Sequence, residues 1–111
     1  MQRSQNLNIK GSILNNTEYL LTQLADECVE VAHDVHKALH FGLHDHNVLN
    51  PTGPSNVERI CAELNDLMGV IDMCQRKGIL PDWSNPTAQG EKRLKVAKFM
   101  RYARECGTLQ A

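Results

Sequence analysis

Two amphipathic segments with recognisable helix ends flank a turn-rich linker, and this arrangement constrains the fold most strongly. The first segment is expected to begin with Asn16 or Thr17 as its N-cap, and to end at Gly42, because glycine tolerates the left-handed conformation that closes many helices. The linker from Leu43 to Pro54, LHDHNVLNPTGP, is predicted to be a loop. Two helices joined by such a loop are expected to pack antiparallel.

The second and third helical segments also have clear boundaries. The second opens with Ser55-Asn56-Val57-Glu58, a capping box in which serine and glutamate each satisfy a free backbone amide, and it closes at Gly78. The third is expected to begin at Asn85-Pro86 or at Thr87, because proline is tolerated at the first helical position, and to end at Gly107.

A single all-α domain is the expected architecture. At 111 residues the chain has the length for one hydrophobic core, so one domain is predicted over residues 1–111 with its core in 17–107. The five aromatic residues are few for a β-rich core. Two long helices and a shorter one leave much apolar surface exposed in a monomer, so an antiparallel helical bundle completed by oligomerisation is predicted.

The apolar residues of each long segment fall on one side of a helix. In the first segment they occupy an arc of about 120° and are Leu20, Leu21, Leu24, Cys28, Val31, Ala32, Val35 and Leu39. In the second segment the main arc contains Val57, Ile60, Cys61, Leu64, Leu67, Met68, Ile71 and Cys74. These two arcs are predicted to form the core.

Four carboxylates lie on or beside these arcs: Glu27, Glu30, Glu63 and Asp66. At ~1.5 Å rise per residue the two pairs differ in level by about one turn in an antiparallel hairpin, so they can face each other. A buried unpaired carboxylate is costly, and a cation is therefore expected to compensate these groups. Oxygen ligands suit hard cations, which favours Mg²⁺, with Mn²⁺ as the alternative.

These residues also carry a family resemblance. LADECVEVAHDVHKALHFGL and ERICAELNDLMGVIDM, within Leu20 to Met73, resemble the MazG-like all-α nucleoside triphosphate pyrophosphohydrolases, particularly the short phage and bacterial forms. The shared motif is ExxE, a spacer and ExxD. The spacer from Val31 to Ala62 is long for the family at 32 residues, and Asn65 stands where glycine is usual before the final aspartate.

The resemblance implies a function and a set of roles. The enzyme would hydrolyse a nucleoside triphosphate to nucleoside monophosphate and pyrophosphate, and would form a homodimer or homotetramer whose helices complete a bundle around the site. The residues implied to bind Mg²⁺ and to act in catalysis are Glu27, Glu30, Glu63 and Asp66.

Charged residues outside the motif have two interpretations each. Asp34 is either an auxiliary ligand or base, or a solvated charge. Lys37 either binds the far end of a polyphosphate or forms an exposed ion pair with Asp34. Lys92 and Lys95 border the apolar face of the third segment and are candidate substrate-binding residues, against a purely solvated role.

Two aromatic side chains and five histidines complete the candidates. Phe41 and Trp83 either stack on a base or pack the loop and the helix ends. Glu30-x-x-His33 has the spacing of di-iron carboxylate bundles, but no histidine lies three residues after Asp66, so solvent exposure is favoured for the histidines.

Composition limits the partners. A net charge of -1 gives no drive toward a nucleic acid polymer or an anionic membrane, although residues 91–111, with a net charge of +4, suit a smaller anion. No stretch approaches ~20 apolar residues, and the first residues lack the apolar centre of a signal peptide, so a cytoplasmic location is expected. The cysteine spacing matches no zinc site, and buried reduced thiols are predicted.

A function from another class remains open at this stage. The same bundle would serve as a non-catalytic helical interaction module if the four carboxylates were only surface charge. The two alternatives differ in whether the carboxylates converge.

Overall fold

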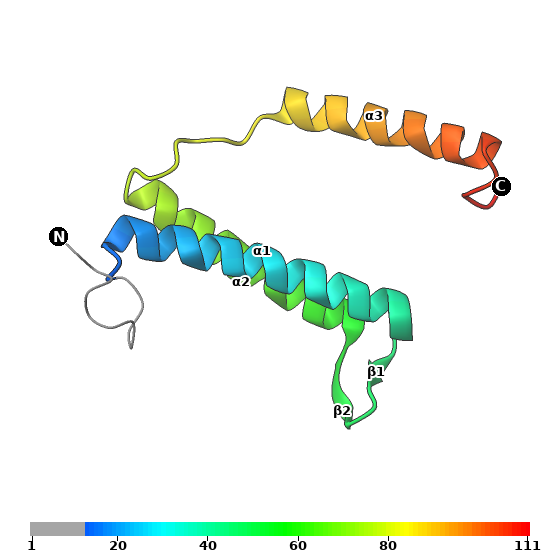
Figure 1. The fold of residues 1–111 in the computed structure, drawn as a ribbon, viewed down its shortest axis with the longest axis horizontal. Helices are drawn as coiled ribbons and strands as arrows, with labels where there is room; N and C mark the ends of the chain where they lie inside the picture. The colour runs from blue at the N-terminus through cyan, green and yellow to red at the C-terminus, as the bar shows by residue number, and fades with distance from the viewer. Residues whose placement is uncertain (1–12) are drawn as a thin grey trace. The chain divides into compact units, whose positions relative to one another are not determined.

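The computed structural model describes residues 13–111, which form three helices and a two-stranded sheet (Figure 1). The elements follow in the order α1 (Asn16–Phe41), β1 (His46–Asn47), β2 (Asn50–Ser55), α2 (Asn56–Arg76) and α3 (Pro86–Glu105). The mainly helical prediction is confirmed. The described residues up to Pro81 form one compact unit and residues 82–111 form a second, and each is described by itself.

The caps explain where the helices begin and end. Helix α1 starts one residue earlier than predicted, because Asn15 is its N-cap and forms a capping box with Glu18. It ends at Gly42, whose φ of 101° lies in the left-handed region. This positive φ favours glycine, whereas the Asp45 carboxylate, 2.7 Å from where a Cβ would lie, belongs to an exposed side chain that can rotate away.

Helices α2 and α3 begin as the sequence predicts. Ser55 and Glu58 form the capping box of α2, and Asn85 caps α3 with Pro86 in its first turn. The α-helical bounds end slightly before the predicted glycines, at Arg76 and Glu105, and Gly78 and Gly107 follow with positive φ angles.

The loop prediction for Leu43 to Pro54 is wrong in part, because this segment contains a β-hairpin. Strands β1 and β2 pair antiparallel, with His46 opposite Ser55 and Asn47 opposite Asn50, and an irregularity in register lies between the two pairs. The Asn47 side chain accepts a hydrogen bond of 2.8 Å from the Leu49 amide, which closes the tight turn. Local side-chain bonding at the turn therefore adds structure that the abundance of turn residues did not reveal.

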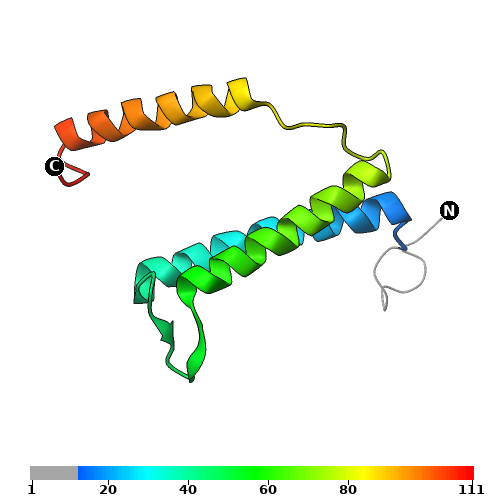
Figure 2. The same ribbon diagram turned by 180° about the vertical axis from the view of Figure 1, so that it is seen from behind.

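Helices α1 and α2 run antiparallel, side by side, over most of their length (Figures 1 and 2). The less exposed side chains of α1 recur at alternating spacings of three and four, the pattern of a helix that packs along one seam. We call the following positions the seam: Leu20, Leu24, Glu27, Val31, Asp34 and Ala38 of α1, with Ile60, Glu63, Leu67, Val70 and Cys74 of α2.

The seam corrects the predicted core, because much of each predicted apolar arc is exposed. The exposed positions each follow a seam residue by one, and we call them the outer apolar face: Leu21, Cys28, Val35, Leu39, Cys61, Leu64 and Met68. Ala32 is exposed as well. The predicted arcs were wide enough for two contact stripes, and within this unit only one stripe meets a partner helix.

The outer apolar face lies on one side of the helix pair. Each of its residues is rotated by about 100° from a seam position, in the direction of the chain. Because α1 and α2 run in opposite directions, equal rotations bring both stripes to the same side. Leu64 is 44% exposed and Met68 is 53% exposed, so this surface is open to solvent.

The prediction that the four cysteines are buried is mostly wrong. All four cysteines are free. Only Cys74, in the seam, is buried, whereas Cys28 and Cys61 lie on the outer apolar face and Cys106 is exposed at the end of α3. Cys28 and Cys61 are exposed because the seam is rotated away from the predicted apolar arcs.

Asn56 joins the end of α1 to the start of α2. Its side-chain amide donates a hydrogen bond of 2.8 Å to the Gly42 carbonyl, and its backbone amide donates one of 2.8 Å to the Asp45 carbonyl. Asn56 is only 5% exposed, so water cannot readily replace these bonds. They fix the hairpin base and the level of α2 beside α1.

The second unit consists of α3 and the segment that folds back after it. Val96, Phe99, Met100 and Ala103 share one face, as predicted, and line a shallow pocket of about 390 Å³ together with Leu109. The Thr108 and Leu109 amides donate hydrogen bonds to the Ala103 carbonyl, which holds the chain end against the helix. None of the helices in residues 13–111 combines the length and apolar character needed to cross a bilayer.

Replacing Asn56 by alanine is expected to lower the free energy of unfolding by about 1–3 kcal/mol, because the Gly42 carbonyl loses its buried partner. The midpoint of urea denaturation measures this change. Asn65→Ala is the matched control, because Asn65 is exposed and its side chain bonds only within its own helix. Equal midpoints for the two variants would contradict the role of Asn56.

Candidate metal centre

Three of the four predicted metal ligands converge between α1 and α2. Glu27, Glu63 and Asp66 each offer a carboxylate oxygen, and these oxygens all lie within 4.8 Å of one another. Glu27 and Glu63 are half-buried seam residues, whereas Asp66 is exposed one turn further along α2. We call these three residues the acidic cluster.

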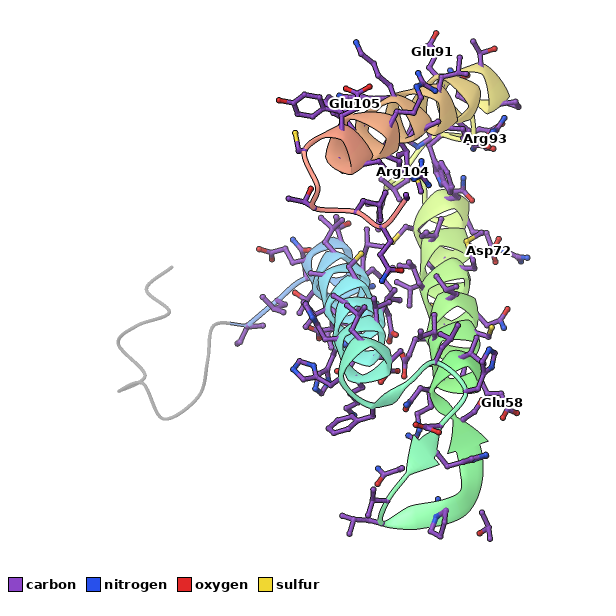
Figure 3. All side chains as sticks on the ribbon, turned by 90° about the vertical axis from the view of Figure 1, so that its right-hand side faces the viewer. Glu58, Asp72, Glu91, Arg93, Arg104 and Glu105 are labelled. Carbon is purple, nitrogen blue, oxygen red and sulfur yellow. The ribbon has the colours of Figure 1, made fainter. Side chains whose placement is uncertain are left out.

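Packing brings the cluster together. Glu27 and Glu63 occupy positions where an apolar residue would normally fill the contact between two helices. Asp66 follows Glu63 by three residues and so projects from nearly the same side of α2. By contrast, Glu58 and Asp72 point away from α1 (Figure 3), which shows that α2 separates its acidic residues onto different sides.

The electrostatic consequence is visible at Glu63. Burial raises the pKa of the Glu63 carboxyl above its usual value, and the negative charges around it raise the pKa further. In decreasing order of effect, those charges belong to Asp66, Asp34, Glu27 and Glu30. The ionised cluster is therefore unfavourable for the folded chain unless a cation offsets it.

Glu30, the fourth predicted ligand, lies at the edge of this group. Its side chain is exposed, and it is not among the three residues whose oxygens converge. Its charge still contributes to the raised pKa of Glu63. Glu30 is thus near the cluster and open to water.

Asp34 is buried, so the interpretation of this residue as a solvated charge is wrong. It occupies a seam position and is 7% exposed. Lys37 forms the predicted ion pair with Asp34, at a distance of 3.9 Å from Nζ to Oδ1. The side chain of Lys37 is 39% exposed, so it is accessible to solvent as well.

The acidic cluster fits a hard divalent cation by its donor chemistry. Oxygens bound to one octahedral Mg²⁺ lie about 4 Å apart when opposite and about 3 Å apart when adjacent, and three ligands include at least two adjacent pairs, so the carboxylates have to draw together by up to about 2 Å. Rotation of side chains at this partly open site can supply such a movement. Three carboxylates also match the preference of Mg²⁺ and Mn²⁺ for oxygen ligands.

A pocket of about 680 Å³ lies at the hairpin end of the same unit. We call it the end pocket. It is formed by the last turns of α1, the β-hairpin and the first turn of α2, and its lining includes Lys37, Phe41, His46 and Arg59. Its volume is in the range of small-molecule sites.

The remaining candidates lie in several places. Phe41 lines the end pocket, and Trp83 is half-exposed in the second unit. Lys92 and Lys95 line the shallow pocket of α3. His33 and His36 are exposed, as predicted.

A scan against protein-family models, a search of curated proteins and a search of solved structures each returned no match for this chain.

Sequence reasoning named Asp34 as an auxiliary ligand or base but did not predict its burial in the seam, and it did not select Arg59. The available signal for Asp34 was the alternation of three- and four-residue spacings from Leu20 through Val31 to Ala38, which places position 34 in the same stripe. Arg59 gave no such signal, because its environment depends on the hairpin.

Glu63→Gln is expected to raise the melting temperature by a few degrees at pH 7 in the presence of EDTA. The pKa of Glu63 is raised in the folded state from its usual 4.5, so its ionisation removes stability as the pH rises through and above 4.5. Glutamine does not ionise, so the variant does not lose this stability. At pH 4, where the carboxyl is mostly protonated in both states, the two proteins should melt at similar temperatures.

Thermal unfolding followed by circular dichroism measures this difference, and Glu58→Gln provides a control of opposite sign. Hydrogen bonds from the backbone and side chain of Ser55 lower the pKa of Glu58, so its ionised form stabilises the fold above the usual pKa. Glu58→Gln should therefore melt lower at pH 7. A wild-type melting temperature at or above that of Glu63→Gln at pH 7 would refute the predicted repulsion.

Proposed function

We propose that this protein is a Mg²⁺-dependent nucleotide pyrophosphohydrolase that cleaves a nucleoside triphosphate to nucleoside monophosphate and pyrophosphate. The observation that carries the proposal is the convergence of Glu27, Glu63 and Asp66 in the contact between two helices. Carboxylates in that position raise the free energy of the folded chain, which a metal-binding role explains and a simple structural role does not. The resemblance of ExxE and ExxD to the MazG-like enzymes supplies the reaction class.

The residues have separate roles in this proposal. Glu27, Glu63 and Asp66 bind the cation, and Glu30 joins them from the edge of the cluster. Mg²⁺, or Mn²⁺ in its place, would supply charge neutralisation at the phosphate oxygens and a lowered pKa for bound water.

The attack itself uses water and needs no covalent intermediate. A water held by Glu30 or Glu27 gives a proton to that carboxylate, its oxygen bonds to the α-phosphorus, and the bond to the oxygen bridging the α- and β-phosphorus atoms breaks. Pyrophosphate leaves with the bridging oxygen. Lys37 binds the polyphosphate, and Lys92 and Lys95 are further candidate substrate contacts. We place the reaction in the cytoplasm, in line with the free cysteines.

We also propose that the chain works as a homodimer or homotetramer. The outer apolar face runs along both helices on one side of the pair. Glu30 and Asp66 lie on the other side. Burial of this face against a second copy would complete a helical bundle while leaving the acidic side open to substrate.

Loss of one cluster carboxylate should abolish most of the activity. We expect Glu63→Gln and Asp66→Asn to reduce kcat by about 100-fold or more, and Asp72→Asn to leave it unchanged, because Asp72 points away from α1. The assay separates pyrophosphate from orthophosphate after incubation with a panel of nucleoside triphosphates and Mg²⁺. Orthophosphate as the first product, or full activity in Glu63→Gln, would overturn the assignment.

Metal binding gives a readout that does not need turnover. Mg²⁺ or Mn²⁺ at ~100 times its Kd should stabilise the wild type by about 2.7 kcal/mol, seen as a higher melting temperature, and should stabilise Asp72→Asn equally. Glu63→Gln should respond much less. A flat response of the wild type would favour the non-catalytic interaction module.

Self-association should depend on the outer apolar face. Light scattering with size-exclusion chromatography is expected to show a dimer or tetramer for the wild type and a monomer for Leu64→Glu and Val35→Glu, because each places a charge in the proposed interface. Glu91→Gln, on exposed α3, also changes the charge by one unit and should leave the assembly intact. A monomeric wild type would overturn this part of the proposal.

A further inference from the structure

The end pocket contains cationic groups that the described chain leaves incompletely satisfied. The Nε atom of Arg59 is buried and has no hydrogen-bond partner among the described residues. Arg59 also forms no ion pair with any carboxylate in residues 13–111. A guanidinium group has donors only, so the missing partner must be an acceptor.

Lys37 supplies a second cation to the same pocket. Among residues 13–111 its one ion pair is the long contact of 3.9 Å with Asp34, and its ammonium group has three donors. Of the residues that line the pocket, Asp45 alone carries a carboxylate. Lys37 and Arg59 therefore give the pocket a positive balance, in contrast to the acidic cluster.

The β-hairpin completes the pocket and holds its shape. The Nδ1 atom of His46 lies 2.6 Å from the Gly53 carbonyl oxygen, so Nδ1–H donates and the ring is fixed. The hairpin base is held by the hydrogen bonds of Asn56 to Gly42 and Asp45. These contacts join the hairpin to the ends of both helices and fix the side of the pocket that the hairpin forms.

The end pocket lies next to the acidic cluster along the helices. Arg59 precedes Glu63 by four residues, which is one helical turn or about 6 Å along the axis and nearly the same side of α2. Lys37 follows the seam residue Asp34 by three, just as Asp66 follows Glu63 by three. In an antiparallel pair these equal offsets bring Lys37 and Asp66 to the same side as the opening of the cluster.

We infer that the end pocket binds the pyrophosphate end of the nucleotide, through Arg59 and Lys37. Phosphate oxygens accept paired hydrogen bonds from a guanidinium group, and both cations line the same pocket. The direction assigned to the nucleotide, with its β- and γ-phosphates toward the hairpin and its nucleoside beyond the cluster, rests on the proposed function. The affinity of the pocket for pyrophosphate does not.

Titration of the full chain with sodium pyrophosphate in EDTA tests the pocket alone. In isothermal calorimetry we expect the wild type to bind, and Arg59→Gln and Lys37→Gln each to weaken binding by about tenfold or more. Arg59→Lys, which keeps the charge and loses the planar fork, should fall between Arg59→Gln and the wild type. Arg76→Gln is the matched control, because Arg76 is an exposed arginine of the same helix paired with Asp72 at 2.7 Å.

Each outcome decides for or against the inference. Absence of pyrophosphate binding at millimolar concentration, or wild-type affinity in both Arg59→Gln and Lys37→Gln with unchanged helical circular dichroism, would overturn it. If adenosine bound the pocket as tightly as pyrophosphate does, the inference would also be overturned, because the pocket would then recognise a nucleoside. If pyrophosphate binds through Arg59 but no nucleotide is hydrolysed, the pocket assignment stands and the proposed function fails.

Discussion

The contact between α1 and α2 depends on how the chain tolerates carboxylates in a helix seam. Apolar seam residues such as Val31 and Leu67 stabilise the pair, whereas Glu27, Glu63 and Asp34 bring negative charges into the same contact. Lys37 offsets Asp34, but within the described residues no basic side chain forms an ion pair with Glu27 or Glu63. The contact between the two helices is therefore least favourable at Glu27 and Glu63, which are also candidate metal ligands.

The helix pair has two sides with different chemistry. Residues three positions after a seam residue, such as Glu30, Lys37 and Asp66, carry charge and face water. Residues one position after a seam residue, such as Leu64 and Met68, are apolar and equally exposed. A chain with one acidic and one apolar side can bind a charged ligand and a second copy at the same time without competition between the two.

The sequence was sufficient to predict the helices but not the orientation of their contact. Caps such as Ser55 with Glu58 are local, so their hydrogen bonds follow from neighbouring residues. Which face of α1 packs against which face of α2 depends on how the side chains of the two helices fit together. Apolar arcs of 120° or more allow each helix several rotations about its own axis. That is why Glu27 was expected beside the core and lies in the seam, and why the burial of Asp34 was underestimated. The surroundings of Arg59 depend on a hairpin whose turn bonds were not recognised.

The acidic cluster and the end pocket are adjacent, and each lacks a partner of opposite charge. The cluster lacks positive charge, as the raised pKa of Glu63 shows, and the pocket lacks an acceptor for the buried Nε of Arg59. Arg59 and Glu63 are one turn apart, yet no ion pair joins them in the described residues, and Arg59 lines the end pocket. A cation alone or an anion alone corrects one deficit only. A divalent cation bound to a polyphosphate would correct both, which is the physical reason for our proposal that the two features form one nucleotide site.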